Sequence, residues 1–208
     1  MKEQINSLAL LIEAVRRKDF YVLDTETTGL QRGEICQIAI LSHDGQVRLN
    51  TFVKTAHPIP DSATAIHGIT DDMIADSPTW DAVEKQVIEI VRGHDLIVYN
   101  ALYDRKMMHQ SREFYSPNKL EWKDICYWYC AMEAYAEYWG AWNEYHQSYR
   151  WQRLTDAIIQ QQLSINNPHS ALGDCMATLA LINKMAMLPD SEAAVVDEIL
   201  ADEDKGLG

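Results

Sequence analysis

Two short apolar runs constrain the fold of this 208-residue chain more than any other feature. Residues 20–23 (FYVL) and 96–99 (LIVY) are continuous apolar stretches, and polar residues follow each of them at once. Runs this short are typical of buried strands, whereas helices show longer periodic patterns. The two runs therefore predict strands that end in polar loops, where functional side chains can gather.

The segments between these runs complete the order of elements. Residues 35–42 and 46–53 are β-rich and flank Asp44-Gly45, a strong signal for a hairpin. Residues 54–78 are expected to be mainly loop, and Thr79 and Asn100 are expected to cap the helices that follow them. Apolar periodicity predicts helices over residues 4–18, 79–92, 123–146, 152–163 and 171–187. This order predicts a mixed α/β layer architecture.

The length suits a single domain with a sizeable core, and the composition is that of a globular protein. No apolar run is long enough to span a membrane, and residues 1–20 lack the pattern of a signal peptide, so we expect a cytoplasmic protein with no membrane partner.

The four cysteines complete no zinc pattern and are expected to be reduced thiols in the core. They are Cys36, Cys126, Cys130 and Cys175.

The formal net charge of -13 weighs against a protein that binds nucleic acid passively through its phosphates. It does not weigh against an enzyme whose acidic residues hold metal ions, because bound cations invert the local field. Part of the charge also lies in residues 188–208, which are expected to form an acidic tail.

Three groups of polar residues follow predicted strands or precede predicted helices. Asp24 and Glu26 follow the first apolar run, and side chains two apart in a strand point to one face. Asp104 falls one turn into the helix after the second run. His169 and Asp174 lie at the start of the last helix. Each group alone is more simply read as exposed acids or helix-capping residues, so only their combination predicts a site.

In this order the stretches DTETTG, NALYD and HSALGD resemble the three motifs of the DEDDh family of 3′→5′ exonucleases, which includes the proofreading epsilon subunit of bacterial DNA polymerase III. The segment AIHGIT (65–70) resembles a further segment of that family. The resemblance spans residues 20–187 and implies an RNase H-like mixed β-sheet flanked by helices. Tyr99 and Met176 differ from the residues that are usual in these motifs, but neither stands at a metal-ligand position.

The resemblance implies an enzyme that releases nucleoside monophosphates from DNA 3′ ends. It implies two divalent metal ions, Mg²⁺ or Mn²⁺, which suit oxygen ligands and can activate water and stabilise the expelled oxyanion. The acids Asp24, Glu26, Asp104 and Asp174 would bind these ions, and His169 would act as the general base. The implied contacts to the terminal nucleotide are Thr27, Leu30, Ile66, His67 and Asn100.

An aromatic segment is the part of the chain that the motifs explain least. Of the six tryptophans and ten tyrosines, 12 lie in residues 115–151. A helical subdomain packing against the sheet is the simplest interpretation. Stacking on unpaired bases, with Arg150 and Arg153 at the phosphates, is a second, and a homodimer or polymerase interface is a third.

The expected organisation is an N-terminal helix (1–19), an exonuclease domain (20–187) that contains the aromatic-rich segment (115–153), and the tail (188–208). The expected partner is DNA with single-stranded or frayed 3′ ends. RNA is the alternative substrate, because the residues do not decide how a 2′-hydroxyl is treated. A non-catalytic module that binds nucleic-acid ends is the alternative from another class of protein.

Overall fold

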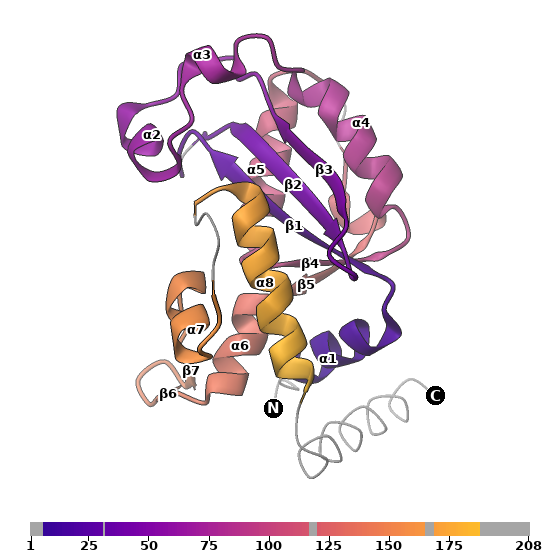
Figure 1. Cartoon of the computed structure of the whole chain (residues 1–208), viewed down its shortest axis with the longest axis vertical. Helices are drawn as coiled ribbons and strands as arrows, with labels where there is room; N and C mark the ends of the chain where they lie inside the picture. The colour runs from indigo at the N-terminus through magenta and orange to yellow at the C-terminus, as the bar shows by residue number, and fades with distance from the viewer. Residues whose placement is uncertain (1–5, 31, 117–119, 165–168, 188–208) are drawn as a thin grey trace.

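The computed structural model describes residues 6–30, 32–116, 120–164 and 169–187 (Figure 1). Its strands are β1 (Phe20–Thr27), β2 (Ile35–Ser42), β3 (Val47–Phe52), β4 (Asp95–Val98), β5 (Tyr127–Cys130), β6 (Trp142–Asn143) and β7 (Ser148–Tyr149). Its α-helices are α1 (Ser7–Arg17), α2 (Asp61–His67), α3 (Asp71–Ile74), α4 (Trp80–Val91), α5 (Ala101–Glu113), α6 (Ala131–Trp139), α7 (Leu154–Gln160) and α8 (Ala171–Ala186), and Trp122–Asp124 form a 3₁₀ turn.

Five strands form one mixed sheet in the order β3-β2-β1-β4-β5. The predicted hairpin is confirmed: β2 and β3 are antiparallel around Asp44-Gly45, and β1 is antiparallel to β2. On its other side β1 is parallel to β4, and β4 is parallel to β5. The carboxyl ends of β1, β4 and β5 therefore lie at one edge of the sheet, which confirms the predicted mixed α/β class.

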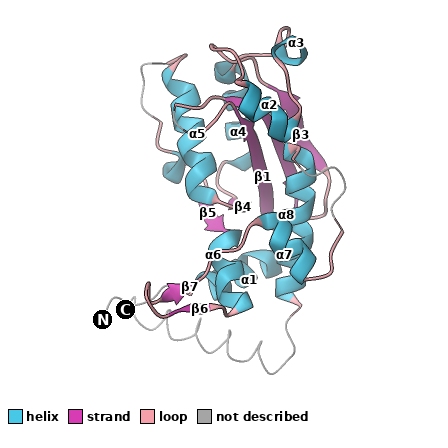
Figure 2. Cartoon of the chain, turned by 90° about the vertical axis from the view of Figure 1, so that its left-hand side faces the viewer, coloured by secondary structure: helices cyan, strands magenta, loops and turns pink. Residues whose placement is uncertain are grey.

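Helices cover both faces of this sheet (Figures 1 and 2). Val22 belongs to a core that the sheet forms with α1, α6, α7 and α8, whereas its neighbour Leu23 belongs to a core formed with α4 and α5. Successive strand residues point to opposite faces, so the continuous apolar run of β1 fills both cores. This double burial is why the run is apolar throughout.

The helix predicted over 123–146 is wrong. The chain instead forms strand β5, then α6, which ends at Gly140 with φ of 72°, and then the β6–β7 hairpin. The run Tyr127–Cys130 is aromatic and pairs with the buried strand β4, so sheet pairing decides its structure over helical periodicity. Cys126 and Cys130 consequently do not lie on successive turns of a helix.

Residues 54–78 contain two short helices that the sequence did not predict. Pro60 precedes α2, and Gly68 ends it with φ of 74°, a conformation that favours glycine. The helix predicted over 79–92 is confirmed, but Thr79 donates its hydroxyl to Asp81 and does not cap the backbone. Asn100 stands at the N-cap of α5, also without a side-chain capping bond.

The four cysteines are free thiols, and three of them are buried, as expected. The predicted acidic tail lies outside the described residues. In the described part of the chain, α1 begins at Ser7 and ends at Arg17, close to the predicted bounds. None of the described helices is long and apolar enough to cross a membrane.

Candidate active site

Strand β1 carries the first two acids. It continues past the apolar run to Thr27, so Asp24 and Glu26 lie inside a strand and not in the loop after it. Both acids still pair with β2, and the register of the pairing shifts between Glu26 and Thr27. Because they are two residues apart, their side chains emerge on the same face of the sheet.

Helix α8 brings the third carboxylate to this face. Ser170 caps the helix by accepting a hydrogen bond from the Gly173 amide at 3.1 Å, which fixes Asp174 in the first turn. Beside it, the buried thiol of Cys175 donates to the Val22 and Ala39 carbonyls of β1 and β2. One oxygen from each of Asp24, Glu26 and Asp174 lies within 4.8 Å of the other two.

Helix α5 supplies the fourth acid. Asp104 lies in its first turn and is only 3% exposed. The Thr25 hydroxyl, between the two acids of β1, donates a 2.7 Å hydrogen bond to the Asp104 carboxylate. Asp104 stands just outside the group of three, but its charge is among the causes that raise the pKa of Asp24.

Burial raises the pKa of all four carboxyls, and the neighbouring acids raise the pKa of Asp24 and Glu26 further. Burial is the largest cause in each, and it brings the pKa of Glu26 and of Asp104 to about 7. The pKa of Asp24 is raised further by Asp104, Asp174 and Glu26. These groups are therefore costly to ionise together unless positive charge is supplied.

The residues present fit divalent cations. The site offers only carboxylate oxygens, the ligands that Mg²⁺ and Mn²⁺ prefer. Among the described residues, the ion pairs to lysine or arginine involve other acids than Asp24, Glu26, Asp104 and Asp174. Bound divalent ions would therefore supply the positive charge that balances this cluster when its acids are ionised.

His169 stands beside Asp174. A hydrogen bond from the His169 backbone and the charge of its imidazole both lower the pKa of Asp174, against the larger effect of burial. The side chain is exposed, and φ at His169 is 61°, a left-handed conformation that few residues other than glycine adopt. The turn thus presents an accessible imidazole at the edge of the acid cluster.

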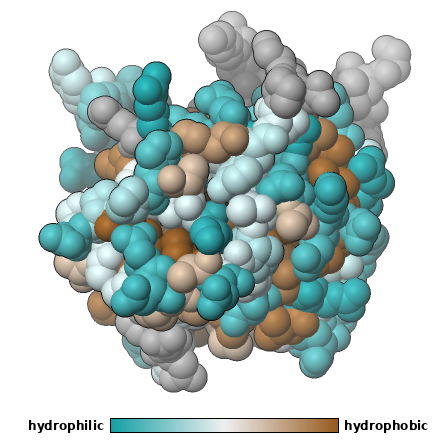
Figure 3. Space-filling model, turned by 90° about the horizontal axis from the view of Figure 1, so that it is seen from above, coloured by the Kyte–Doolittle hydropathy of each residue, from teal (hydrophilic) through white to brown (hydrophobic). Residues whose placement is uncertain are grey.

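A pocket of about 540 Å³ opens beyond Glu26. It is lined by Thr27 at the end of β1, by Leu30 in the loop that follows, and by Ile66 and His67 of α2. The structure thus brings four of the five predicted nucleotide contacts together. Leu30 and Ile66 expose 72% and 63% of their surface at its walls. The face of the molecule seen in Figure 3 is otherwise mainly hydrophilic, with apolar side chains in small groups.

Asn100, the fifth predicted contact, does not line this pocket. It lies at the start of α5, half-buried. The neighbouring Tyr103 lines the pocket instead, and its hydroxyl is 2.6 Å from the Thr27 hydroxyl. Sequence analysis missed Tyr103, although its position directly before Asp104 offered a signal.

Two further residues missed in the sequence shape the pocket. A Cβ on Gly33 would lie 1.9 Å from the Gly29 carbonyl oxygen, so only glycine allows the loop after β1 to fold back on itself. Glu34 is buried and accepts hydrogen bonds from the Ala56 and His57 amides. It thereby fixes the segment that leads into α2, a contact between distant residues that no local motif reveals.

Comparisons with known proteins agree with this geometry. The family model RNase T, described as an exonuclease, matches residues 21–182. An uncharacterized exonuclease, CP81, of Escherichia phage 186 is 39% identical over 175 residues, which cover 81% of this chain and 88% of that protein. Exodeoxyribonuclease 10 of Escherichia coli K12 is 28% identical over 77% of this chain and 66% of its own length.

A structure of exonuclease X in complex with 5′ overhanging duplex DNA superposes with a TM-score of 0.60 and 27% identity, covering 80% of this chain and 90% of that one. The epsilon subunit of DNA polymerase III from Pasteurella multocida is 34% identical over 94 residues, and this chain spans 37% of its length. The expected RNase H-like architecture is confirmed by the fold of these neighbours. With its family match over most of its length, this chain belongs to the exonuclease family.

Proposed function

We propose that this protein removes nucleotides one at a time from the 3′ end of DNA, with Mg²⁺ or Mn²⁺ as the metal. The observation that carries the proposal is the convergence of three carboxylates within 4.8 Å, next to a pocket of about 540 Å³. A pocket of this size admits one nucleotide and excludes continuous duplex. A single nucleotide would therefore enter the pocket with its phosphate beside the acids. This placement favours attack at the terminal phosphodiester bond.

The acids Asp24, Glu26, Asp104 and Asp174 would hold two divalent ions. When bound, such ions activate water and stabilise the negative charge on the departing 3′ oxygen. Asp24 is the central ligand, because the charges of the other three all act on it. The Thr25 hydroxyl orients Asp104 by its 2.7 Å hydrogen bond, so this ligand is held in place before substrate arrives.

His169 would take the proton from the attacking water. Its side chain is exposed, whereas Asp24, Glu26 and Asp174 are half-buried and Asp104 is buried, and it stands next to Asp174. General-base catalysis by a side chain contributes about 10²- to 10⁴-fold in rate. Exposure lets the imidazole pass the proton on to solvent after each turnover.

The pocket would recognise the free 3′ end. Leu30 and Ile66 offer apolar surface to the terminal base and sugar, and the hydroxyls of Thr27 and Tyr103 offer polar contacts. The His67 Nδ1 accepts from the Ile69 amide at 3.0 Å, so a neutral ring carries its proton on Nε2. A 3′-phosphate or a circular strand would not fit this arrangement.

A time course on single-stranded oligonucleotides tests the proposal. With 5′-labelled DNA and Mg²⁺ or Mn²⁺ we expect a ladder of progressively shorter products, and with 3′-labelled DNA immediate release of labelled mononucleotide. EDTA and Asp24→Ala should stop both. Cleavage of circular strands, or full activity on a 3′-phosphorylated strand, would show that the site does not read the 3′ end.

RNA is the second candidate substrate, and matched RNA and DNA oligonucleotides in the same assay distinguish the two. DNA is favoured because exodeoxyribonuclease 10 and exonuclease X, by their names, act on or bind DNA. A non-catalytic module is disfavoured because the acid cluster and the adjacent histidine are all present. The proposed catalytic unit spans residues 20–187, and residues 115–153 form an aromatic-rich part of it. The proposal requires neither a homodimer nor a polymerase partner.

A further inference from the structure

The β6–β7 hairpin, which we call the aromatic hairpin (residues 142–151), takes no part in the site described above. It connects α6 to α7 in the chain and lies on the same side of the molecule as α2 in the view of Figure 1. Its two strands are fixed by an edge-to-face contact of Trp142 with Tyr149, whose ring centroids are 5.1 Å apart. The Arg150 amide also donates to the Ala141 carbonyl at 2.8 Å, so the hairpin is closed at its base.

Aromatic side chains of this hairpin project into solvent. Tyr145 at the tip exposes 89% of its surface, and Trp151 at the base exposes 68%. Large aromatics exposed together on an ordered element are typical of binding surfaces. The simplest interpretation of the aromatic segment, packing against the sheet, therefore accounts for Trp122 and Tyr135, which are buried, but not for the hairpin.

Positive charge flanks the exposed tryptophan. Arg150 and Arg153 lie on either side of it in sequence, and both are exposed. Neither guanidinium forms an ion pair with a carboxylate of the part of the chain that the structure describes. In a chain with a net charge of -13, two unpaired arginines beside an exposed indole indicate an anionic ligand with flat, stackable groups.

A hydrogen bond ties the residue after the hairpin to the segment between β4 and α5. The Tyr99 hydroxyl donates to the Gln152 carbonyl, next to Trp151, at 2.9 Å. Tyr99 directly follows the strand β4, whose last pair with β1 is Val98 with Leu23, so it lies one position further along, level with Asp24. The nucleotide pocket lies beyond Glu26, toward the carboxyl end of β1. Figure 2 shows α2, which lines the pocket, toward one end of the molecule and the hairpin toward the other, so a nucleic-acid strand that leaves the pocket across the acids would run toward the hairpin.

We propose that the aromatic hairpin binds the single-stranded part of the substrate on the 5′ side of the scissile phosphate. Bases stack on Trp151 and Tyr145, and Arg150 and Arg153 contact the phosphates between them. This inference rests on the proposed function, because it assumes that the 3′ end enters the pocket. The hairpin would thereby hold the DNA strand between successive cleavage steps.

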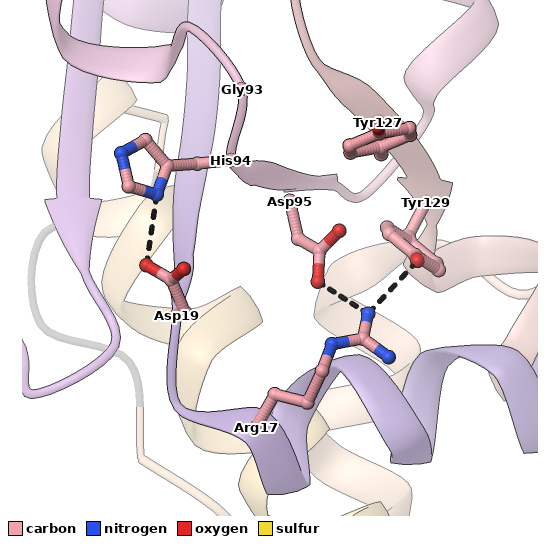
Figure 4. Close-up of a pocket in the computed structure, with 7 residues that line it drawn as sticks. All are labelled: Arg17, Asp19, Gly93, His94, Asp95, Tyr127 and Tyr129. Atoms are coloured by element: carbon pink, nitrogen blue, oxygen red, sulfur yellow. Dashed lines mark hydrogen bonds and ion pairs between the residues drawn. The ribbon is translucent and has the colours of Figure 1, made fainter.

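The opposite edge of the sheet offers a control surface. A pocket of about 340 Å³ is formed there at the amino-terminal ends of β1, β4 and β5 (Figure 4). Its polar side chains already have partners: Arg17 pairs with Asp95 at 2.5 Å, and the His94 imidazole is hydrogen-bonded to Asp19 at 2.8 Å. Tyr127 on its rim is 66% exposed, much like Trp151, but lies at the far end of the strands from the acids.

The test compares two substrate lengths in wild type, Trp151→Ala and the control Tyr127→Ala. A DNA trinucleotide fills only the pocket and the cleavage position, whereas a strand of about twelve nucleotides also reaches the hairpin. For Trp151→Ala we expect KM on the long strand to rise about 5- to 100-fold, with kcat and KM on the trinucleotide unchanged. Trp151→Phe should restore most of the affinity, and Tyr127→Ala should behave as wild type.

Binding in EDTA separates this proposal from the proposed activity. Fluorescence anisotropy of the long strand needs no turnover, so it reports on the hairpin even if hydrolysis is never observed. Replacing both Arg150 and Arg153 by Gln should lower the slope of log affinity against log salt by about 0.7 for each arginine. Equal KM changes at both lengths, an unchanged affinity for the long strand, or loss of a homodimer in Trp151→Ala would overturn the proposal.

Discussion

Asp104→Asn should stabilise the metal-free protein while it impairs the site. Asp104 is 3% exposed, and burial raises the pKa of its carboxyl from 3.8 to about 7. Between these two values the folded protein keeps a proton that the unfolded chain has lost, so the stability of the fold falls as pH rises from about 4 to about 7. Asparagine has nearly the same shape and can still accept the Thr25 hydrogen bond, but it carries no charge.

The size of the effect follows from the pKa difference. A pKa about 3 above the ordinary value corresponds to about 4 kcal/mol, at about 1.4 kcal/mol for each pKa unit. Rearrangement of the neighbouring carboxylates and entry of water reduce this, so we expect ~2–4 kcal/mol of added stability at pH 8. At about 2–4 °C per kcal/mol for a domain of this size, the melting temperature should rise by roughly 5–15 °C.

The assay is thermal unfolding in EDTA at pH 5 and pH 8. At pH 5 the folded wild type still holds its proton on Asp104 while the unfolded chain has lost most of its own, so the variant should gain only about 1 kcal/mol, well below its gain at pH 8. Added Mn²⁺ should then stabilise the wild type more than the variant. Asp76→Asn, at an exposed position, serves as the control and should change neither curve. Equal melting at pH 8, or a gain at pH 5 as large as that at pH 8, would refute the assignment of Asp104 as a buried acid with a raised pKa.

Three further predictions address other parts of the site. His169→Ala should lower kcat by about 10²- to 10⁴-fold without a change in melting temperature, and a near-wild-type rate would exclude the histidine as the general base. Gly33→Ala should displace the loop after β1, because its Cβ would meet the Gly29 carbonyl, and KM on short strands should rise well above that of wild type. Ile66→Ala should raise KM about 5- to 30-fold, since it removes exposed apolar surface at the pocket wall, with no change in stability.

The position of the acids could be predicted because each depends on a local pattern. A strand fixes Asp24 and Glu26 on one face, and a helix start fixes Asp174 relative to Ser170. The sequence alone underestimated the length of β1, because polar residues follow its apolar run. Pairing with β2 nevertheless continues to Thr27, so hydrogen bonds to a neighbouring strand extend β1 beyond its apolar part.

The missed features depend on contacts between distant residues. Strand β5 forms because Tyr127–Cys130 pairs with β4, some thirty residues earlier in the chain. Tyr103 joins the pocket through Thr27, which lies in another element, and Glu34 fixes the approach to α2 by binding the Ala56 amide. Periodicity and motif spacing carry no information on such pairs, so these parts of the site become visible only in three dimensions.

The two ends of β4 show why the acid cluster requires bound cations. Asp95 begins this strand and is 7% exposed, and the chain provides Arg17 at 2.5 Å to balance its charge. Asp104 follows the other end of the same strand and is more deeply buried, yet its described partner is the neutral Thr25 hydroxyl. The same fold therefore pairs buried Asp95 with an arginine but, among the described residues, places no such partner against Asp104. Asp104 lies beside Asp24 without a described basic partner, so its ionised form destabilises the empty site. Protonation removes this cost at low pH, and bound positive charge offsets it when the carboxyl is ionised.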